Sequence, residues 1–497
     1  MTLVKISARD GSQVEFINKN PKSGKMKEVY FAPDHSYVVA FYKTMPDANR
    51  MECLEEIVGT YRQRIIKGRS GNYWRDLFRW PEKLVDYQGR VGLVVPSFHS
   101  DFFFSDEQGE KREKTGDWFA LPKNFNRHSQ EVKGNLGKFI AVCLRLSRAV
   151  RRLHAEGLSH SDLSYRNCLI DPKGGKACII DIDGLVVPQK YPPEVLGSMD
   201  FIAPEVLATA HLPNIDSRRR WPCLSTDLHA LAVLIYLFAL HRHPLRGGQY
   251  LSDDADEDEN LMMGGKALFI EHPTNTSNRP ILTAEDTPRL PWVDSSTLPY
   301  RTMGPYLSPL FERAFIDGLH DPEKRPRAHD WEDALEKTTD LLQPCSNLTC
   351  DKKFYIFDAT TQPKCPYCGT SFVGSIPMLE LYYHTDRGLQ PENHRIMVYK
   401  DMSFFLWHVY QNLSPNENLD DTQRQRIGYF TFHMDCWLFV NEALATCKDL
   451  GVGDQPLNPS RGNVINIGSH IKLLPNQWLL LSPEEKGRLV RVKLLNH

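Results

Sequence analysis

Several side chains that carry oxygen ligands lie close together in the middle of the sequence. Asp162 and Asn167 are five positions apart, Asp181 follows Asn167 by 14 residues, and Asp183 comes two residues later. Oxygen ligands from Asp and Asn suit a hard divalent cation such as Mg²⁺, which usually keeps waters and phosphate oxygens as its other ligands. These residue types therefore indicate a site for such a cation.

The elements around these residues can be predicted from hydrophobic periodicity. Residues 137–155 carry apolar side chains at helical spacing, which predicts an amphipathic helix that ends shortly before Asp162. Residues 168–171 and 176–180 are apolar runs separated by a Pro-Lys-Gly-Gly turn, and they predict a β-hairpin. Asp181 directly follows the second strand, so the hairpin would present its carboxylate.

The order of these segments resembles that of protein kinases. His160-Ser161-Asp162, with Asn167 after it, matches the catalytic loop of that family. The run 181–184 matches the metal-binding segment, and Ala203-Pro204-Glu205 matches the end of the activation segment. The resemblance implies an α+β, bilobal protein-kinase-like fold that binds ATP and Mg²⁺. It also implies transfer of the γ-phosphoryl group to a protein hydroxyl, preferably on Ser or Thr, with Tyr as the alternative acceptor.

The resemblance implies catalytic roles for the matching residues. Asp162 is expected to orient the substrate hydroxyl and accept its proton, and Arg166 to supply charge near the γ-phosphate. Asn167 and Asp181 are expected to hold Mg²⁺, and Asp183 is a candidate second ligand.

Other matches are expected to be structural. Asp227 should hydrogen-bond the backbone of the catalytic loop that contains His160, and Arg325 should form a buried ion pair with Glu205. Ser161 replaces the arginine with which the family reads a phosphorylated activation loop. This departure argues against control by phosphorylation of that loop.

The resemblance places a nucleotide-binding hairpin near the N-terminus, in residues 22–30. When the hairpin is aligned on Val29, which would cover the base, only Gly24 falls on a glycine position, and Lys22 and Lys27 occupy the other two. Lysine side chains could meet the phosphates in place of backbone amides. An ordinary basic hairpin is the alternative.

Lys43, at the end of a predicted strand over 37–43, is the candidate for the lysine that holds the α- and β-phosphates. Its spacing from Val39-Ala40 is one residue longer than in the family. A partner glutamate is expected on the helix predicted for 46–66, and Glu55 is preferred there over Glu52 and Glu56. Val95 lies in the expected hinge between the lobes, where backbone groups would meet adenine.

Four cysteines form a separate motif near residue 350. Their positions are Cys345, Cys350, Cys365 and Cys368. Four thiolates at this spacing predict a tetrahedral structural Zn²⁺ site, with disulfides or an iron–sulfur cluster as the alternatives. A closed site of this kind has no open coordination position, so we expect no catalysis there.

The 497 residues are enough for two to four domains. We expect a kinase domain at 1–340, a zinc ribbon at 341–374 and a β-rich domain at 375–497. The kinase lobes would divide at about residue 97, into 1–97 and 98–340. The short apolar runs of the last part predict a small β-sandwich, which loosely resembles a forkhead-associated domain. Its expected role is structural or partner docking, since Gly487-Arg488 only partly matches the phosphothreonine-binding pattern.

Composition excludes some classes of protein. A formal net charge of −2 argues against a nucleic-acid-binding chain. The sequence contains no signal-peptide core and no apolar run of the roughly 20 residues that span a bilayer, so we expect a soluble cytoplasmic protein without a membrane partner. The acidic run 253–259 is expected to be a solvated loop.

Less specific motifs resemble one bacterial branch, the tellurite-resistance-associated kinases. They include Tyr73-Trp74, Trp80-Pro81 and an insertion around 269–280. The branch implies a von Willebrand A-type protein as substrate and a metal-dependent protein phosphatase as opponent. Two alternatives remain open. The thin glycine hairpin, the displaced Lys43 and the missing arginine favour a pseudokinase scaffold, and the pair of aspartates at 181 and 183 favours a small-molecule kinase.

Overall fold

The computed structural model describes residues 2–105, 111–187, 190, 196–282 and 294–496. The chain folds into two compact units. The first contains residues 1–134, 138–300 and 309–332, and the second contains residues 135–137, 301–308 and 333–497. The cysteine motif and the C-terminal strands thus belong to one unit, while the division into three domains stays a prediction.

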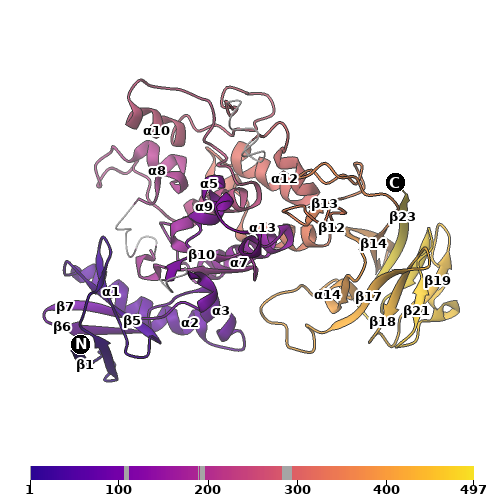
Figure 1. The fold of residues 1–497 in the computed structure, drawn as a ribbon, viewed down its shortest axis with the longest axis horizontal. Helices are drawn as coiled ribbons and strands as arrows, with labels where there is room; N and C mark the ends of the chain where they lie inside the picture. Colours follow the sequence, from indigo (N-terminus) through magenta and orange to yellow (C-terminus); the bar gives the residue numbers. More distant parts are fainter. Residues whose placement is uncertain (1, 106–110, 188–189, 191–195, 283–293, 497) are drawn as a thin grey trace. The chain divides into compact units, whose positions relative to one another are not determined.

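The first unit begins with strands. A five-stranded antiparallel sheet has the order β3-β4-β5-β7-β6. Its strands are β3 (Lys22–Ser23), β4 (Lys27–Phe31), β5 (Tyr37–Tyr42), β6 (Lys83–Tyr87) and β7 (Arg90–Pro96). The hairpin of β1 (Leu3–Ser7) and β2 (Gln13–Ile17) precedes it. Figure 1 shows this sheet beside helix α1.

The sheet buries different residues on its two faces, because side chains alternate along each strand. On one face Phe16 of β2 packs with Phe41 and Val94 of the sheet. On the other face Tyr42 and Leu93 pack with Leu54 of helix α1 (Ala48–Glu56). Side chains on this second face therefore look towards the helix.

The helix predicted for 46–66 is interrupted. α1 begins after Asp47, whose side chain accepts a hydrogen bond from the Arg50 amide at 2.8 Å. A π-helical turn at Ile57–Tyr61 separates α1 from α2 (Arg62–Ile66). The indole Nε1 of Trp80 donates to the Ile57 carbonyl at 2.7 Å, so the turn's start is fixed by a buried side chain.

The rest of the first unit is mostly helical. The predicted catalytic segment follows α7 (Leu136–Ala155), and the hairpin of β10 (Cys168–Asp171) and β11 (Lys176–Ile179) lies where the sequence predicts it. Helix α9 (Leu224–Leu240) is buried nearly all round. Other helices of this unit are α3 (Gly71–Leu77), α4 (Asp117–Ala120), α5 (Pro122–Asn126), α6 (Gln130–Lys133) and α8 (Pro204–Thr209). Two more helices, α12 (Gly304–Glu312) and α13 (Ala328–Thr339), contain residues of both units.

The acidic insert differs from the expected loop. Ala255–Met263 form helix α10, and the Asp254 side chain caps it by accepting from the Glu257 amide at 2.8 Å. Several of its acidic residues lie in the first turn, where negative charge is stabilised by the helix dipole. The charge run is therefore a helix N-terminus.

The second unit contains two antiparallel sheets around one core. The six-stranded sheet consists of β14 (Ser375–Thr385), β15 (Gly388–Met397), β19 (Lys448–Val452), β20 (Asn463–Val464), β22 (Gln477–Leu480) and β23 (Arg488–Asn496). The four-stranded sheet consists of β16 (Ser403–Phe405), β17 (Arg426–His433), β18 (Cys436–Asn441) and β21 (His470–Lys472). Leu379 and Val490 of the first sheet share a buried core with Phe430 of the second.

A short hairpin in the same unit precedes these sheets. β12 (Leu342–Pro344) pairs with β13 (Phe354–Ile356) around the first two cysteines of the motif.

Among the residues that the structure describes, no helix is long and apolar enough to span a bilayer.

Candidate active site

The predicted catalytic loop, residues 160–167, is held by a buried carboxylate. Asp227 lies in the first turn of α9, is 2% exposed, and accepts hydrogen bonds from the amides of His160 at 2.8 Å and Ser161 at 3.3 Å. The Nε2 atom of His154 lies 3.2 Å from the same carboxylate. The expected contact between Asp227 and the loop backbone is thus present.

Two further contacts tie this loop to the hairpin. The His160 ring Nε2 lies 3.0 Å from the Ile180 carbonyl oxygen, and the Ile180 amide donates to the Asn167 carbonyl at 3.0 Å. Asp181 follows immediately with a φ of 59°, a left-handed conformation that is strained for a residue other than glycine. Such strain is frequently found at functional sites.

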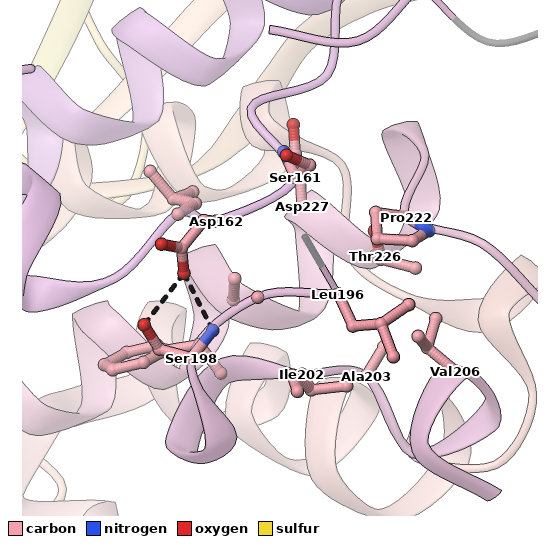
Figure 2. A pocket seen from close by; sticks show the side chains of 14 residues that line it. Ser161, Asp162, Leu196, Ser198, Ile202, Ala203, Val206, Pro222, Thr226 and Asp227 are labelled. Atoms are coloured by element: carbon pink, nitrogen blue, oxygen red, sulfur yellow. Dashed lines mark hydrogen bonds between the residues drawn. The ribbon is translucent and has the colours of Figure 1, made fainter. Parts of the chain in front are cut away.

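Asp162 receives hydrogen bonds on both carboxylate oxygens. The Asn167 amide nitrogen donates to Oδ2 at 3.0 Å and to the Asp162 carbonyl at 2.8 Å. The amide and hydroxyl of Ser198 donate to Oδ1 at 2.7 and 2.8 Å, as Figure 2 shows. Since the Asn167 amide nitrogen is used, its side-chain oxygen is the atom that can serve a cation.

Ser198 was not among the residues singled out from the sequence. It directly follows Gly197, in the segment that leads to Ala203-Pro204-Glu205. The resemblance of that segment was the available signal. The contact itself joins residues that are 36 positions apart, so only the fold reveals it.

Asp183, the second aspartate after the hairpin, is paired with a lysine. Lys27 Nζ, from the start of β4, lies 2.6 Å from Asp183 Oδ2 and 3.2 Å from Asp181 Oδ1. The Tyr42 hydroxyl donates to the same oxygen of Asp183, and Arg50 donates to the Asp183 carbonyl. Asp183 is therefore buried and held by three side chains.

Burial and the neighbouring positive charge shift the pKa of Asp183 in opposite directions. Burial by itself would raise the pKa of Asp183, but the Lys27 ammonium and the hydrogen bonds from Lys27 and Tyr42 lower that pKa to about 2. Burial would also lower the pKa of Lys27, yet Asp183 and Asp181 together raise it above its ordinary value. Both members of the pair are thus charged at neutral pH.

Lys43 lies at the end of β5 but away from Asp181 and Asp183. Its exposed side chain donates to the Gly24 carbonyl at 2.7 Å and does not contact Asp181 or Asp183. β5 ends at Tyr42, whose side chain faces the helix, and the next residue along an extended chain points the other way. Tyr42 therefore stands where the lysine was expected.

The expected pairing of Glu55 with Lys43 is wrong. Glu55 Oε1 accepts from Arg9 at 2.8 Å, and its side chain is 57% exposed. Glu56 forms an ion pair with Lys190 instead. The buried side of α1 carries Cys53 and Leu54, so neighbouring Glu55 lies outside that face.

The other nucleotide-site candidates lie on this sheet. The amide of Gly24 donates to the Lys27 carbonyl at 2.9 Å, so the β3–β4 turn uses this N–H internally. Val29 pairs with Ala40, and Val95 pairs with Val38. Their roles towards ATP stay predictions.

Arg166 is exposed, and its side chain makes no hydrogen bond or ion pair within the part of the chain that the structure describes. Arg325, 2% exposed, forms the expected two-point ion pair with Glu205, at 2.8 and 2.7 Å.

This is an α+β, protein-kinase-like fold. In the second unit it is followed by a cysteine cluster and a region of β-sheet.

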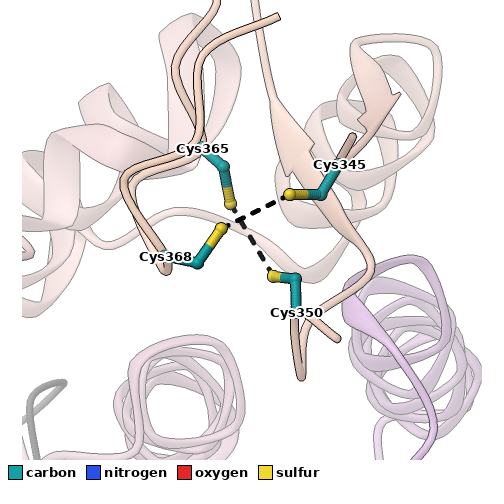
Figure 3. Close-up of side chains that lie close together, drawn as sticks. All are labelled: Cys345, Cys350, Cys365 and Cys368. Carbon is teal, nitrogen blue, oxygen red and sulfur yellow. Dashed lines mark hydrogen bonds between the residues drawn. The ribbon is translucent and has the colours of Figure 1, made fainter. Parts of the chain in front are cut away.

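The four cysteines come together as the sequence predicts. Figure 3 shows their side chains pointing at a common centre. All four sulfur atoms lie within 4.8 Å of one another, with Sγ–Sγ distances of 3.4 Å for Cys345 and Cys368 and 3.8 Å for Cys350 and Cys365. Tetrahedral Zn–S bonds of about 2.3 Å would place sulfurs about 3.8 Å apart. The cluster can therefore bind a metal ion of this size, and the distances exclude disulfides.

The arginine that partly matched a phosphothreonine-binding pattern is occupied. Arg488 is 5% exposed, and its guanidinium donates to both oxygens of Glu392 at 2.8 Å. This ion pair leaves the arginine without access to a phosphate.

Comparisons with known proteins find distant similarity to kinases. No protein-family model matches the chain. The probable serine/threonine-protein kinase RTK1 of Saccharomyces cerevisiae is 29% identical over 143 residues, which are 25% of this chain and 21% of that protein. The chain thus spans about a fifth of the length of this curated relative.

Solved structures with low similarity include two proteins of Toxoplasma gondii. ROP2, described as a virulence factor with a protein-kinase fold and no enzymatic activity, has a TM-score of 0.40 and 15% identity, and the match covers 66% of this chain and 81% of ROP2. A rhoptry kinase has a TM-score of 0.41 and 14% identity, with 68% of this chain and 82% of that one covered.

Proposed function

We propose that the protein is a protein kinase that transfers the γ-phosphoryl group of ATP to a Ser or Thr hydroxyl of a partner protein. The observation that carries this proposal is the arrangement of Asp162. Its carboxylate accepts from the Ser198 hydroxyl and from Asn167, and Asn167 is tied to the hairpin that ends at Asp181. A carboxylate so placed can orient a substrate hydroxyl and take its proton.

The donor atoms fit a magnesium ion. The Asn167 side-chain oxygen and the half-exposed carboxylate of Asp181 would hold it. When bound, Mg²⁺ neutralises charge on the phosphates during transfer. Arg166, exposed and four residues after Asp162, would add positive charge near the γ-phosphate. Val95 would present backbone groups to adenine.

The experiment is transfer of radiolabel from [γ-³²P]ATP to the protein itself and to a general acceptor protein. Asp162→Asn and Asp181→Ala should each lower incorporation by at least a factor of 100, and mass spectrometry should find phosphoserine or phosphothreonine. Asp386→Asn, an exposed aspartate in the turn between β14 and β15, is the matched control and should behave as wild type. Absence of transfer by the wild type would reject the proposal.

A pseudokinase scaffold is the second candidate, and one contact favours it. The Asp183 carboxylate is already occupied by Lys27 and Tyr42, and no lysine of β5 faces it. Calorimetry with Mg·ATP separates the two candidates, since a scaffold of this kind would show neither uptake of nucleotide nor transfer of label.

The sequence resemblance supports narrower proposals. These are a bacterial tellurite- or metal-stress pathway, a von Willebrand A-type protein as substrate, a metal-dependent protein phosphatase as opponent, and a cytoplasmic location. We also propose that Zn²⁺ is the ion of the cysteine cluster, because four thiolates in a closed site suit it.

A further inference from the structure

Strand β5 is the strand in which protein kinases carry the phosphate-binding lysine. Here it places a tyrosine beside Asp181 and Asp183, which we call the acidic pair. Val39, Ala40, Phe41 and Tyr42 follow one another in β5, and Tyr42 stands where the spacing of the family places the lysine. Tyr42 is 5% exposed, and its hydroxyl donates to Asp183. A neutral hydroxyl thus occupies the position from which a cation would act.

A cation reaches the same place from the neighbouring strand. Lys27 of β4 pairs directly with Tyr42 in the antiparallel register. Side chains of directly opposed residues lie on the same face of a sheet, so Lys27 projects beside the tyrosine. Its Nζ lies 5.4 Å from the centre of the Tyr42 ring and 2.6 Å from Asp183.

The partner of this lysine has also changed. On α1 the residue that approaches the hairpin is Arg50, which donates to the Asp183 carbonyl, while Glu55 is exposed and bound to Arg9. The carboxylate that positions the lysine is therefore Asp183. One of its oxygens accepts from both Lys27 and Tyr42, which makes Asp183 a positioning residue and less suited to hold Mg²⁺.

The β3–β4 turn explains why a side chain, and not a backbone amide, would have to contact the nucleotide phosphates. It is short, and the Gly24 amide is bonded within it, so this amide is not available for phosphates. Lysine is a compact point charge on a flexible stem, and it can reach phosphate oxygens without a fixed geometry. Lys27, held at the acidic pair by Asp183 and Asp181, is the cation placed to do this.

We propose that Lys27 is the residue that contacts the nucleotide phosphates, that Asp183 positions it, and that Lys43 has no part in nucleotide binding. This inference rests on the proposed function, because it assigns a residue of the same ATP site. Exchange of the lysine between adjacent strands keeps the charge on the same face of the sheet.

The test compares alanine variants of Lys27 and Lys43, the two lysines of this sheet that could contact the nucleotide. Lys27→Ala should lower kcat/KM for ATP by at least a factor of 100 and raise the Kd for Mg·ATP at least tenfold. Lys43→Ala should leave both within a factor of two. A second variant, Lys27→Ala with Tyr42→Lys, should recover at least a tenfold part of the lost kcat/KM, because residue 42 lies opposite residue 27.

A variant that removes both charges of the Lys27–Asp183 pair guards against loss of folding. Lys27→Met with Asp183→Asn should keep the melting temperature close to that of wild type while still binding Mg·ATP at least tenfold more weakly. Loss of activity in Lys43→Ala with retention of activity in Lys27→Ala would overturn the inference. Tighter binding of Mg·ATP by Lys27→Ala would also overturn it, because Lys27 would then block the nucleotide site. A wild type that binds Mg·ATP but does not transfer phosphate would reject the kinase proposal alone.

Discussion

Ser198 donates both its backbone amide and its hydroxyl to a single oxygen of Asp162, at 2.7 and 2.8 Å. The activation segment is thereby attached to the proposed base. Among the described residues 196–205, Ser198 alone hydrogen-bonds this carboxylate.

Replacement of Ser198 by alanine should lower kcat for phosphoryl transfer about tenfold. The variant loses one hydrogen bond to a charged group, worth about 1.5 kcal/mol, while the backbone donor remains. Steady-state kinetics with ATP measures the effect. Ser198→Thr keeps the hydroxyl and should retain most of the activity; equal rates for the alanine variant and wild type would show that the contact has no part in transfer.

Replacement of Glu205 by alanine should lower the free energy of unfolding of the first unit by about 3 kcal/mol, because it leaves the buried guanidinium of Arg325 without its carboxylate. Urea denaturation measures this change. Glu131→Ala removes an ion pair with Lys173 whose side chains are 59% and 78% exposed, and it should cost less than about 1 kcal/mol. Similar costs for the two variants would contradict the buried-pair account.

The cysteine cluster should bind one Zn²⁺ per chain. Removal of the ion by a chelator should lower the melting temperature of the second unit, since a structural metal contributes directly to folding. Metal analysis by mass spectrometry gives the stoichiometry. Cys365→Ser should lose the ion, whereas Cys436→Ser, in the β18 strand and outside the cluster, should keep it. Retention of zinc by the first variant would refute the site.

Asp340 gives the second unit a defined dependence on pH. Its carboxylate lies 2.7 Å from His394 Nε2 and 3.2 Å from His408 Nε2. Burial would raise the pKa of Asp340, but the two histidines outweigh burial and lower this pKa below its ordinary value. The charged form is therefore the one that stabilises the fold, above the pKa of the unfolded chain.

We expect Asp340→Asn to lower the free energy of unfolding by about 3 kcal/mol at pH 7. The difference from wild type should shrink as the pH falls below about 4, because the stabilisation is lost as Asp340 is protonated through its lowered pKa. Chemical denaturation at several pH values measures it, with Asp386→Asn as the exposed control. A difference that grows on acidification would contradict the assigned direction.

Motifs that act within a short stretch could be predicted from the sequence. The four cysteines and the hairpin before Asp181 are found as expected, because each depends on local spacing. The contact of Asp227 with the amide of His160 spans 67 residues, and it could be expected only from the resemblance to protein kinases. The fold class followed from the order of these motifs.

The nucleotide lobe could not be predicted as well, because its chemistry depends on which face of a strand a residue occupies. Tyr42 and Lys43 are adjacent, and that single step along the chain moves the side chain to the opposite face. The role of Ser198 depends on a contact across 36 residues. The acidic run forms the start of α10, where the helix dipole stabilises the negative charges of its first turn.

The central claim is that Asp162, Asn167 and Asp181 support phosphoryl transfer. Its most direct test is incorporation of label from [γ-³²P]ATP by wild type and Asp181→Ala, measured side by side with Mg²⁺ present. We predict labelling of Ser or Thr by the wild type and a loss of at least a factor of 100 in the variant. Equal labelling by the two proteins, or none by the wild type, would contradict the claim.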